Sequence, residues 1–334
     1  MPELPEVETI KNDLKKRILG KKIVGLEIRS RKMMKSKPAD LVKILKGNSF
    51  SGLDRIGKLL IFELADRKNF LLIHLKMTGQ LIYCGKGRIM AGGHALTPSC
   101  SPLPAQAGLV RGRILPPLTP PCEGGELKSS PLQGEVPEGR RGGVGGGADG
   151  LPNKHTHLIF SFANGAKLFF NDLRKFGYAK IVGEKELEKI KGEYGIEPLT
   201  KDFTLKAFKE ALGVRNAPIK AILLNQGLIA GIGNIYADEA LFEARIRPSR
   251  RAGSLSDKET EALFKAVNNI IKKAIKYRGT TFSNYVDASG RKGNFTKLLK
   301  VYHREGEKCR RCGGLIKKTK VAGRGTRFCE KCQK

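Results

Sequence analysis

The sequence predicts a multidomain α+β protein, in which an N-terminal antiparallel β-sandwich flanked by helices precedes a helical domain and a small cysteine-rich tail. Three observations support this prediction. Short apolar runs with polar turns fill residues 1–183, helical periodicity fills 184–300, and paired cysteines lie within 301–334. The length of 334 residues suits two to three domains, and 40% hydrophobic residues are enough to form packed cores.

The N-terminal region begins with a predicted amphipathic helix. Its apolar residues recur at helical spacing: Val7, Ile10, Leu14 and Ile18. Pro5 near the start and Gly20 at the end match the usual helix boundaries. Six short apolar runs separated by polar turns then predict strands of an antiparallel sandwich: 59–64, 70–75, 80–84, 157–162, 166–170 and 178–182.

A Gly/Pro-rich segment at 87–150 interrupts this sandwich domain. Gly or Pro occupies 24 of its 64 positions, and helical or strand periodicity of apolar residues is absent. Gly and Pro at this density disfavour both a helix and a strand ladder. We therefore interpret 87–150 as a low-complexity insertion into one connection between strands.

The pattern of apolar residues becomes helical after residue 183. Predicted helices cover 184–195, 204–213, 218–226, 234–246 and 257–279. These segments predict a helical domain at 184–300 that separates the sandwich from the tail.

The tail contains four of the seven cysteines in a C-x2-C-x16-C-x2-C pattern: Cys309, Cys312, Cys329 and Cys332. This spacing predicts a zinc ribbon, and four thiolates leave no open position for water, so one structural zinc ion is expected. Two disulfides are the alternative. The remaining cysteines, Cys84, Cys100 and Cys122, follow no such pattern and are expected to be free thiols.

The charge of the chain indicates a polyanionic partner. The formal net charge is +31, of which only +1 falls within 87–150. A neutral metabolite requires no such excess, whereas nucleic acid attracts it. No apolar run approaches the roughly 18 residues of a membrane-spanning helix, and the start of the chain lacks an apolar signal core. We therefore expect neither a membrane protein nor an exported one.

The N-terminus offers a reactive group. Pro2 permits removal of Met1, and the chain would then begin with a secondary amine, a group whose pKa is near 7.7–8.0 in an α-amino position. Attack of such an amine on a sugar C1′ gives an iminium ion that favours loss of the C2′ proton and of the 3′ phosphate. Glu3 and Glu6 are adjacent acid–base candidates. Most Met-Pro starts are nevertheless ordinary.

Six motifs occur in an order that resembles the bacterial formamidopyrimidine-DNA glycosylases, a family that excises oxidised purines from DNA. They are PELPEVET (2–9), IGKLL (56–60), HLKMTGQL (74–81), NDLRKFG (171–177), GIGNIYADEALF (231–242) and the four-cysteine pattern. The resemblance covers 1–86 and 151–334. It implies a helix–two-turn–helix element in the helical domain and a finger of the family's zinc-binding type.

The resemblance implies four catalytic residues. Pro2 matches the Schiff-base nucleophile, Glu3 the proton donor and Lys58 the lysine that assists β-elimination. Arg324 matches an arginine that holds phosphate and is linked to δ-elimination.

Further positions match residues that contact DNA. Those of the wedge that fills the space of an extruded nucleotide are Met77, Arg174 and Phe176; core packing is the alternative for Met77 and Phe176. The other matches are His155, Lys175, Arg215, Lys220, Asn234 and Arg324. The chain departs from the family's DPRRFG pattern, since Leu173 replaces a proline and Lys175 replaces an arginine, which removes a bidentate donor.

The resemblance predicts a base-excision repair enzyme that removes formamidopyrimidine or 8-oxoguanine and then nicks the strand as an abasic-site lyase. Its expected partner is double-stranded DNA with oxidised bases or abasic sites. We expect a monomer in the bacterial cytoplasm, associated with the nucleoid through DNA binding. The alternatives are an endonuclease VIII-like enzyme specific for oxidised pyrimidines, a non-catalytic DNA-binding protein, and a decayed copy inactivated by the insertion.

Overall fold

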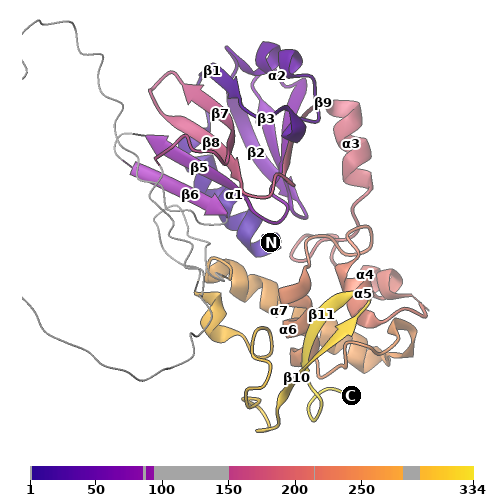
Figure 1. Cartoon of the computed structure of the whole chain (residues 1–334). Coiled ribbons are helices and arrows are strands. Elements are labelled where there is room, and N and C mark those ends of the chain that lie inside the picture. The colour runs from indigo at the N-terminus through magenta and orange to yellow at the C-terminus, as the bar shows by residue number, and fades with distance from the viewer. Residues whose placement is uncertain (1, 86–87, 94–149, 214, 281–293) are drawn as a thin grey trace, which may run out of the picture.

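The computed structural model describes residues 2–85, 88–93, 150–213, 215–280 and 294–334. The two sheets and the helices of residues 4–18 and 38–45 form one body, and the helices from residue 205 onward and the cysteine-rich hairpin form a second body (Figure 1). The N-terminus of the chain lies between the two bodies (Figure 1). This placement makes the first residues of the chain part of the boundary between them.

Two antiparallel sheets confirm the predicted sandwich. One contains, in spatial order, β1 (Ile23–Ile28), β7 (Thr156–Phe162), β8 (Lys167–Asp172), β5 (Gly79–Gly85) and β6 (Arg88–Gly93). The other contains β2 (Phe50–Ile56), β3 (Leu59–Leu64), β4 (Asn69–His74) and β9 (Tyr178–Gly183). All six predicted strands are present, and β1, β2 and β6 are additional.

The helix α1 (Leu4–Ile18) packs its apolar face on the core of the sandwich, as its periodicity predicts. Val7, Ile10 and Ile18 are buried in the same cluster as the aromatic rings of the two sheets. Leu4, at the start of α1, belongs instead to the core of the helical domain. The helix therefore connects the two hydrophobic cores at its first turn. A second helix in this domain, α2 (Pro38–Leu45), was not predicted.

The segment 87–150 was expected to contain no paired strand, and this expectation is wrong for its first residues. Arg88–Gly93 form β6, which pairs antiparallel with β5 from Gln80↔Gly93 to Gly85↔Arg88. The edge of an existing strand offers backbone donors and acceptors whatever the side chains of the incoming segment. Composition therefore does not reveal this strand. The rest of the segment, 94–149, lies outside the described residues.

The helical domain contains the predicted helices, with shorter ends. They are α3 (Glu184–Gly192), α4 (Leu205–Leu212), α5 (Ile219–Leu224), α6 (Asn234–Glu243) and α7 (Asp257–Lys276). The same domain has 3-10 turns at Ala252–Ser254 and Phe295–Leu298, and the sandwich domain has one at Arg31–Met33. The strands β10 (Ile316–Val321) and β11 (Arg324–Cys329) form the C-terminal hairpin, and β11 lies against α6 (Figure 1). Within the described part of the chain, no helix is both long enough and apolar enough to cross a bilayer.

Candidate active site and zinc finger

The Glu3 carboxylate is buried at the start of α6. It accepts hydrogen bonds from the backbone N–H groups of Ile235 (3.1 Å) and Tyr236 (3.5 Å), which have no partner within the helix. Burial raises the pKa of Glu3 to about 7, and the opposing effects of Lys58 and of the helix N–H group do not cancel it. Near neutral pH the carboxyl is therefore divided between its protonated and ionised forms, which suits proton donation. Pro2, the preceding residue, is also buried.

Two glycines make room for the N-terminal segment. Gly231 has φ +85°, and a Cβ atom there would lie 2.4 Å from Leu4 Cδ1. A Cβ atom on Gly233 would lie 2.1 Å from the Glu3 carboxyl carbon. The GIGN motif therefore needs glycine at both positions, because Glu3 and Leu4 occupy the space beside them.

We expect Gly233→Ala to reduce base excision by about 10²-fold, because the methyl group displaces the Glu3 carboxyl from its position. Gly192→Ala is a matched control, since a Cβ atom at position 192 meets nothing within 4 Å. Single-turnover excision of 8-oxoguanine would measure both variants. Equal excision rates for Gly233→Ala and the control would show that base excision does not depend on this position of the Glu3 carboxyl.

Glu6 anchors the N-terminal segment to the helical domain. Its carboxylate accepts hydrogen bonds from the backbone N–H groups of Glu3 (2.8 Å) and Thr280 (2.8 Å) and from the Tyr236 hydroxyl. The sequence indicated Glu6 as a candidate for acid–base catalysis. In the structure its oxygens instead accept hydrogen bonds that join the start of α1 to α6 and to Thr280. Burial, with Glu6 beside it, raises the pKa of Tyr236 well above its usual value, so the phenol remains a donor.

Lys58 lies near Glu3 and Glu6 of the N-terminal segment. Its ammonium is buried and donates to the Ile232 carbonyl at 2.8 Å. Burial lowers the pKa of Lys58, and Arg324 acts in the same direction, while Glu3 and Glu6 oppose the shift. Two residues that the sequence did not indicate, Arg55 and Glu197, hold Gly57, the residue before Lys58. Glu197 accepts hydrogen bonds from the Gly57 N–H group at 2.6 Å and from Arg55 Nη1 at 2.7 Å.

A basic cavity of about 830 Å³ lies between the two bodies, next to Lys58. Lys58 of the sandwich and Arg324 of the hairpin both line it, together with Lys35, His74, Lys76, Tyr178, Lys180 and Tyr194. His74 was not predicted as a site residue, although it begins the HLKMTGQL motif at 74–81. Burial, with Lys76 and Lys58 nearby, lowers the pKa of His74 to about 3, so its ring is neutral. The cavity is thus lined by several cations, as binding of a polyanion requires.

The residues predicted to form the wedge are together and exposed. Met77 is 40% and Phe176 is 52% exposed, which excludes the alternative of core packing. Arg174 Nη1 lies 3.4 Å from the Met77 sulfur, and the guanidinium lies 4.7 Å from the centre of the Phe176 ring. Lys175 is exposed on the same loop with φ +55°. His155 is near the base of this loop, where its carbonyl accepts from the Asp172 N–H group at 2.9 Å.

Lys220 requires a correction, because a direct contact of its ammonium with DNA does not agree with this structure. The side chain is fully buried and pairs with the fully buried Asp238 at 2.6 Å. Lys220 also donates to Thr326 Oγ1 (2.8 Å) and to the Gly325 carbonyl (3.1 Å). The Asn234 amide donates to that carbonyl as well, at 2.9 Å. An ammonium is buried only when it is paired, and this pair holds the hairpin turn next to Arg324.

Arg215 lies apart from these residues, on the exposed loop between α4 and α5. Its side chain donates to the Ala211 carbonyl at 3.3 Å, and its own carbonyl accepts from Gly253. The loop position leaves the guanidinium accessible. The contacts described for it do not join it to Glu3 or Lys58.

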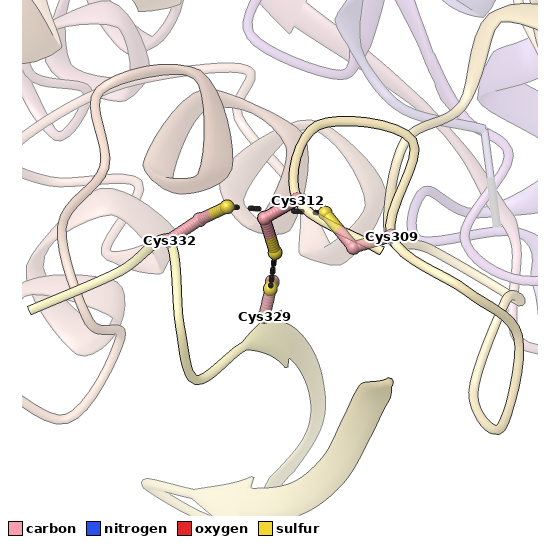
Figure 2. Close-up of side chains that lie close together, drawn as sticks. All are labelled: Cys309, Cys312, Cys329 and Cys332. Atoms are coloured by element: carbon pink, nitrogen blue, oxygen red, sulfur yellow. Dashed lines mark hydrogen bonds between the residues drawn. The ribbon is translucent and has the colours of Figure 1, made fainter. Parts of the chain in front are cut away.

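The four cysteines of the tail come together in space (Figure 2). Their sulfur atoms all lie within 4.8 Å of one another. The separations of 3.9 Å (Cys309–Cys332) and 3.5 Å (Cys312–Cys329) exclude disulfides, which need about 2.05 Å, and are near the roughly 3.8 Å edge of a tetrahedral zinc–thiolate site. The residues therefore fit one structural zinc ion. Of the other cysteines, Cys84 is buried with Ile82, while Cys100 and Cys122 lie outside the described residues.

We expect Cys329→Ala to remove the zinc and to lower DNA affinity at least about tenfold, because the metal supplies much of the folding energy of so small a module and the module carries Arg324. Cys122→Ser is the control. Metal content by atomic absorption and binding to an abasic duplex would be measured together. Full zinc occupancy in Cys329→Ala would contradict the assignment of the ligand.

Comparisons with known proteins agree with this arrangement. Three family models match the chain: the formamidopyrimidine-DNA glycosylase N-terminal domain at residues 1–179, the H2TH domain of the same glycosylase at 194–286, and the zinc finger found in FPG and IleRS at 306–334. A sandwich, an H2TH domain and a four-cysteine finger in this order define a class of DNA-processing enzymes.

Curated relatives extend over the whole chain. The formamidopyrimidine-DNA glycosylases of Pelotomaculum thermopropionicum and Carboxydothermus hydrogenoformans are 35% and 37% identical to it, cover all of it, and are themselves covered to 99% and 100%. A solved complex of Lactococcus lactis Fpg with abasic-site DNA has a TM-score of 0.74 at 33% identity, with both chains fully covered. The chain belongs to the formamidopyrimidine-DNA glycosylase family, as its six motifs predict.

Proposed function

We propose that this chain excises oxidised purines from double-stranded DNA and then cleaves the strand at the abasic site. The observation that carries the proposal is the buried Glu3 carboxyl, whose pKa is about 7 and which directly follows Pro2 in the chain. Such a carboxyl can protonate a departing base or the sugar ring oxygen while the neighbouring amine attacks C1′. Its curated relatives are named formamidopyrimidine-DNA glycosylases, and solved Lactococcus lactis complexes contain abasic or Fapy-dG DNA.

Each candidate residue has a separate role in the proposed reaction. The Pro2 nitrogen forms a bond to C1′ as the base leaves with its bonding electrons and a proton. The C1′–O4′ bond then breaks, O4′ takes up a proton, and the iminium ion remains. Loss of a C2′ proton to this electron sink expels the 3′ phosphate, and a second elimination expels the 5′ phosphate. Lys58 and Arg324, which line the same basic cavity, hold the phosphates and assist these eliminations.

The remaining candidates are proposed as DNA contacts. Met77, Arg174 and Phe176 fill the space of the extruded nucleotide, and Lys175, His155 and Arg215 meet phosphates from the sandwich and the helical domain. Asn234 and Lys220 are the exceptions: they do not contact DNA directly but hold the hairpin turn that presents Arg324. We place the domain limits at 1–183, 184–300 and 301–334, and we propose association with the bacterial nucleoid through this DNA binding.

Borohydride trapping tests the proposal. A chain with a verified Pro2 N-terminus is incubated with a duplex containing 8-oxoguanine and reduced, and the adduct is located by peptide mass spectrometry. We expect a covalent adduct at Pro2 and cleaved DNA. The absence of an adduct from correctly processed protein would reject the enzyme and favour a DNA-binding or decayed protein.

An oxidised-pyrimidine glycosylase is a second candidate. It is favoured by one observation, that a solved complex of wild-type Lactococcus lactis Fpg with DNA containing an oxidised pyrimidine has a TM-score of 0.75. Competition between 8-oxoguanine and 5-hydroxycytosine duplexes would rank the two lesions, and we expect the purine to be excised faster.

A further inference from the structure

A third large apolar side chain is exposed beside the predicted wedge. Leu173 is 50% exposed, compared with 40% for Met77 and 52% for Phe176. The register of β5 and β8 pairs Gly79 with Asp172, so the residues just before β5 and just after β8 continue side by side. Leu173 therefore belongs to the same end of the five-stranded sheet as the wedge residues.

The loop that carries Leu173 is held in place by a buried carboxylate. Asp172 is fully buried and accepts hydrogen bonds from the N–H groups of Arg174 (3.0 Å) and Gly177 (2.7 Å) and from the Thr78 hydroxyl. Thr78 Oγ1 also accepts from the Arg174 N–H group, at 3.1 Å. The exposure of Leu173 is thus a property of a fixed loop, since both ends of the loop are bonded to one carboxylate.

The charged residues around Leu173 indicate which kind of surface it can contact. Arg174 and Lys175 follow it, and Lys76 lies before Met77 on the adjacent segment. An apolar contact rimmed by cations does not suit another basic surface or a lipid interior, but it suits stacked bases between phosphates. Apolar side chains that enter such a stack act as wedges between base steps.

We propose that Leu173 inserts into the base stack at the lesion together with Met77 and Phe176, and that it increases the preference of the protein for damaged over intact DNA. This inference rests on the proposed function. At an intact step the insertion must break base stacking, whereas an extruded or abasic nucleotide leaves the space open. Leu173 therefore stabilises the lesion complex selectively.

Binding measurements on three variants test the inference. Leu173→Ala removes most of the side chain, and Leu173→Pro replaces it with the residue of the family's usual motif. Leu199→Ala is the matched control, because Leu199 is 45% exposed on the segment between α3 and α4. The probes are a duplex with a tetrahydrofuran abasic analogue next to 2-aminopurine and the same duplex without damage.

We expect both Leu173 variants to bind the abasic duplex about 5- to 10-fold more weakly than wild type, with unchanged affinity for intact DNA and a smaller rise in 2-aminopurine fluorescence. Leu199→Ala should match wild type in all three measurements. Thermal unfolding of each variant shows whether the fold is retained, and Leu173→Ala alone suffices if the proline variant unfolds.

The inference is overturned if Leu173→Ala retains wild-type affinity for the abasic duplex and wild-type fluorescence, or if it loses affinity equally for both duplexes. Failure of the proposed function is separate, because wild-type protein would then give no borohydride adduct with 8-oxoguanine DNA. A wild-type adduct with no effect at Leu173 rejects this inference alone.

Discussion

An extension ahead of Pro2 is expected to abolish base excision and borohydride trapping together, with a loss of at least about 10³-fold in rate. The nitrogen of Pro2 is a nucleophile only as a free amine, because in a peptide bond its lone pair is delocalised into the carbonyl group. Pro2 is buried and directly precedes Glu3, the residue that caps the start of α1. The extended and the processed protein therefore differ in one reactive atom.

Two preparations of the same chain provide this measurement, one beginning at Pro2 and one with an additional N-terminal residue, each verified by mass spectrometry. Affinity for an uncleavable abasic duplex is the control, since an extended chain that still binds DNA has lost chemistry and not recognition. Excision by the extended protein at the rate of the processed one would exclude Pro2 as the nucleophile.

The second large effect is expected for Glu3→Gln, which should slow base excision by about 10²- to 10⁴-fold. The amide oxygen of glutamine can still accept the N–H group of Ile235, so the geometry of the α6 start is kept while the proton is lost. Cleavage of a preformed abasic site requires no departing base, and we expect it to fall by less than about tenfold.

The pH dependence follows from the raised pKa of Glu3. Because the protonated carboxyl is the donor, its active fraction decreases as the pH rises through about 7, and excision by the wild-type protein should lose this contribution above that pH. Glu3→Gln should not show this titration. Glu27→Gln is the control, an exposed carboxylate on β1. Equal loss of excision and abasic cleavage in Glu3→Gln would argue against a donor role.

Much of the fold can be predicted from local patterns. The helix α1 and the strands β3, β4, β5, β7, β8 and β9 have apolar residues at spacings that match buried faces, and the structure contains all of them. The strand β1 was missed because it is largely half-exposed and includes Gly25, which weakens the alternation of apolar residues. The strand β6 was missed because backbone pairing with β5 determines it.

The candidate site was only partly predictable. Motifs indicated Glu3, Lys58 and the cysteines, but they could not show that Glu3 occupies the start of α6, 232 residues away from its hydrogen-bond donor Ile235. The match to the family predicted Lys220 as a DNA contact. The structure shows instead that its side chain is buried and paired with Asp238, which the motif could not reveal.

The sequence by itself determined the three-part organisation, the zinc ligands, the basic charge and the order of motifs, because periodicity, spacing and composition are local quantities. The tertiary structure alone decided which groups lose their water and which meet. A pKa near 7 for Glu3, the buried Lys220–Asp238 pair and the exposure of Leu173 on a loop held by Asp172 all follow from packing between distant segments. Desolvation and long-range contact have no local signature in a chain, and they appear only when the sandwich, the helices and the zinc finger are brought together.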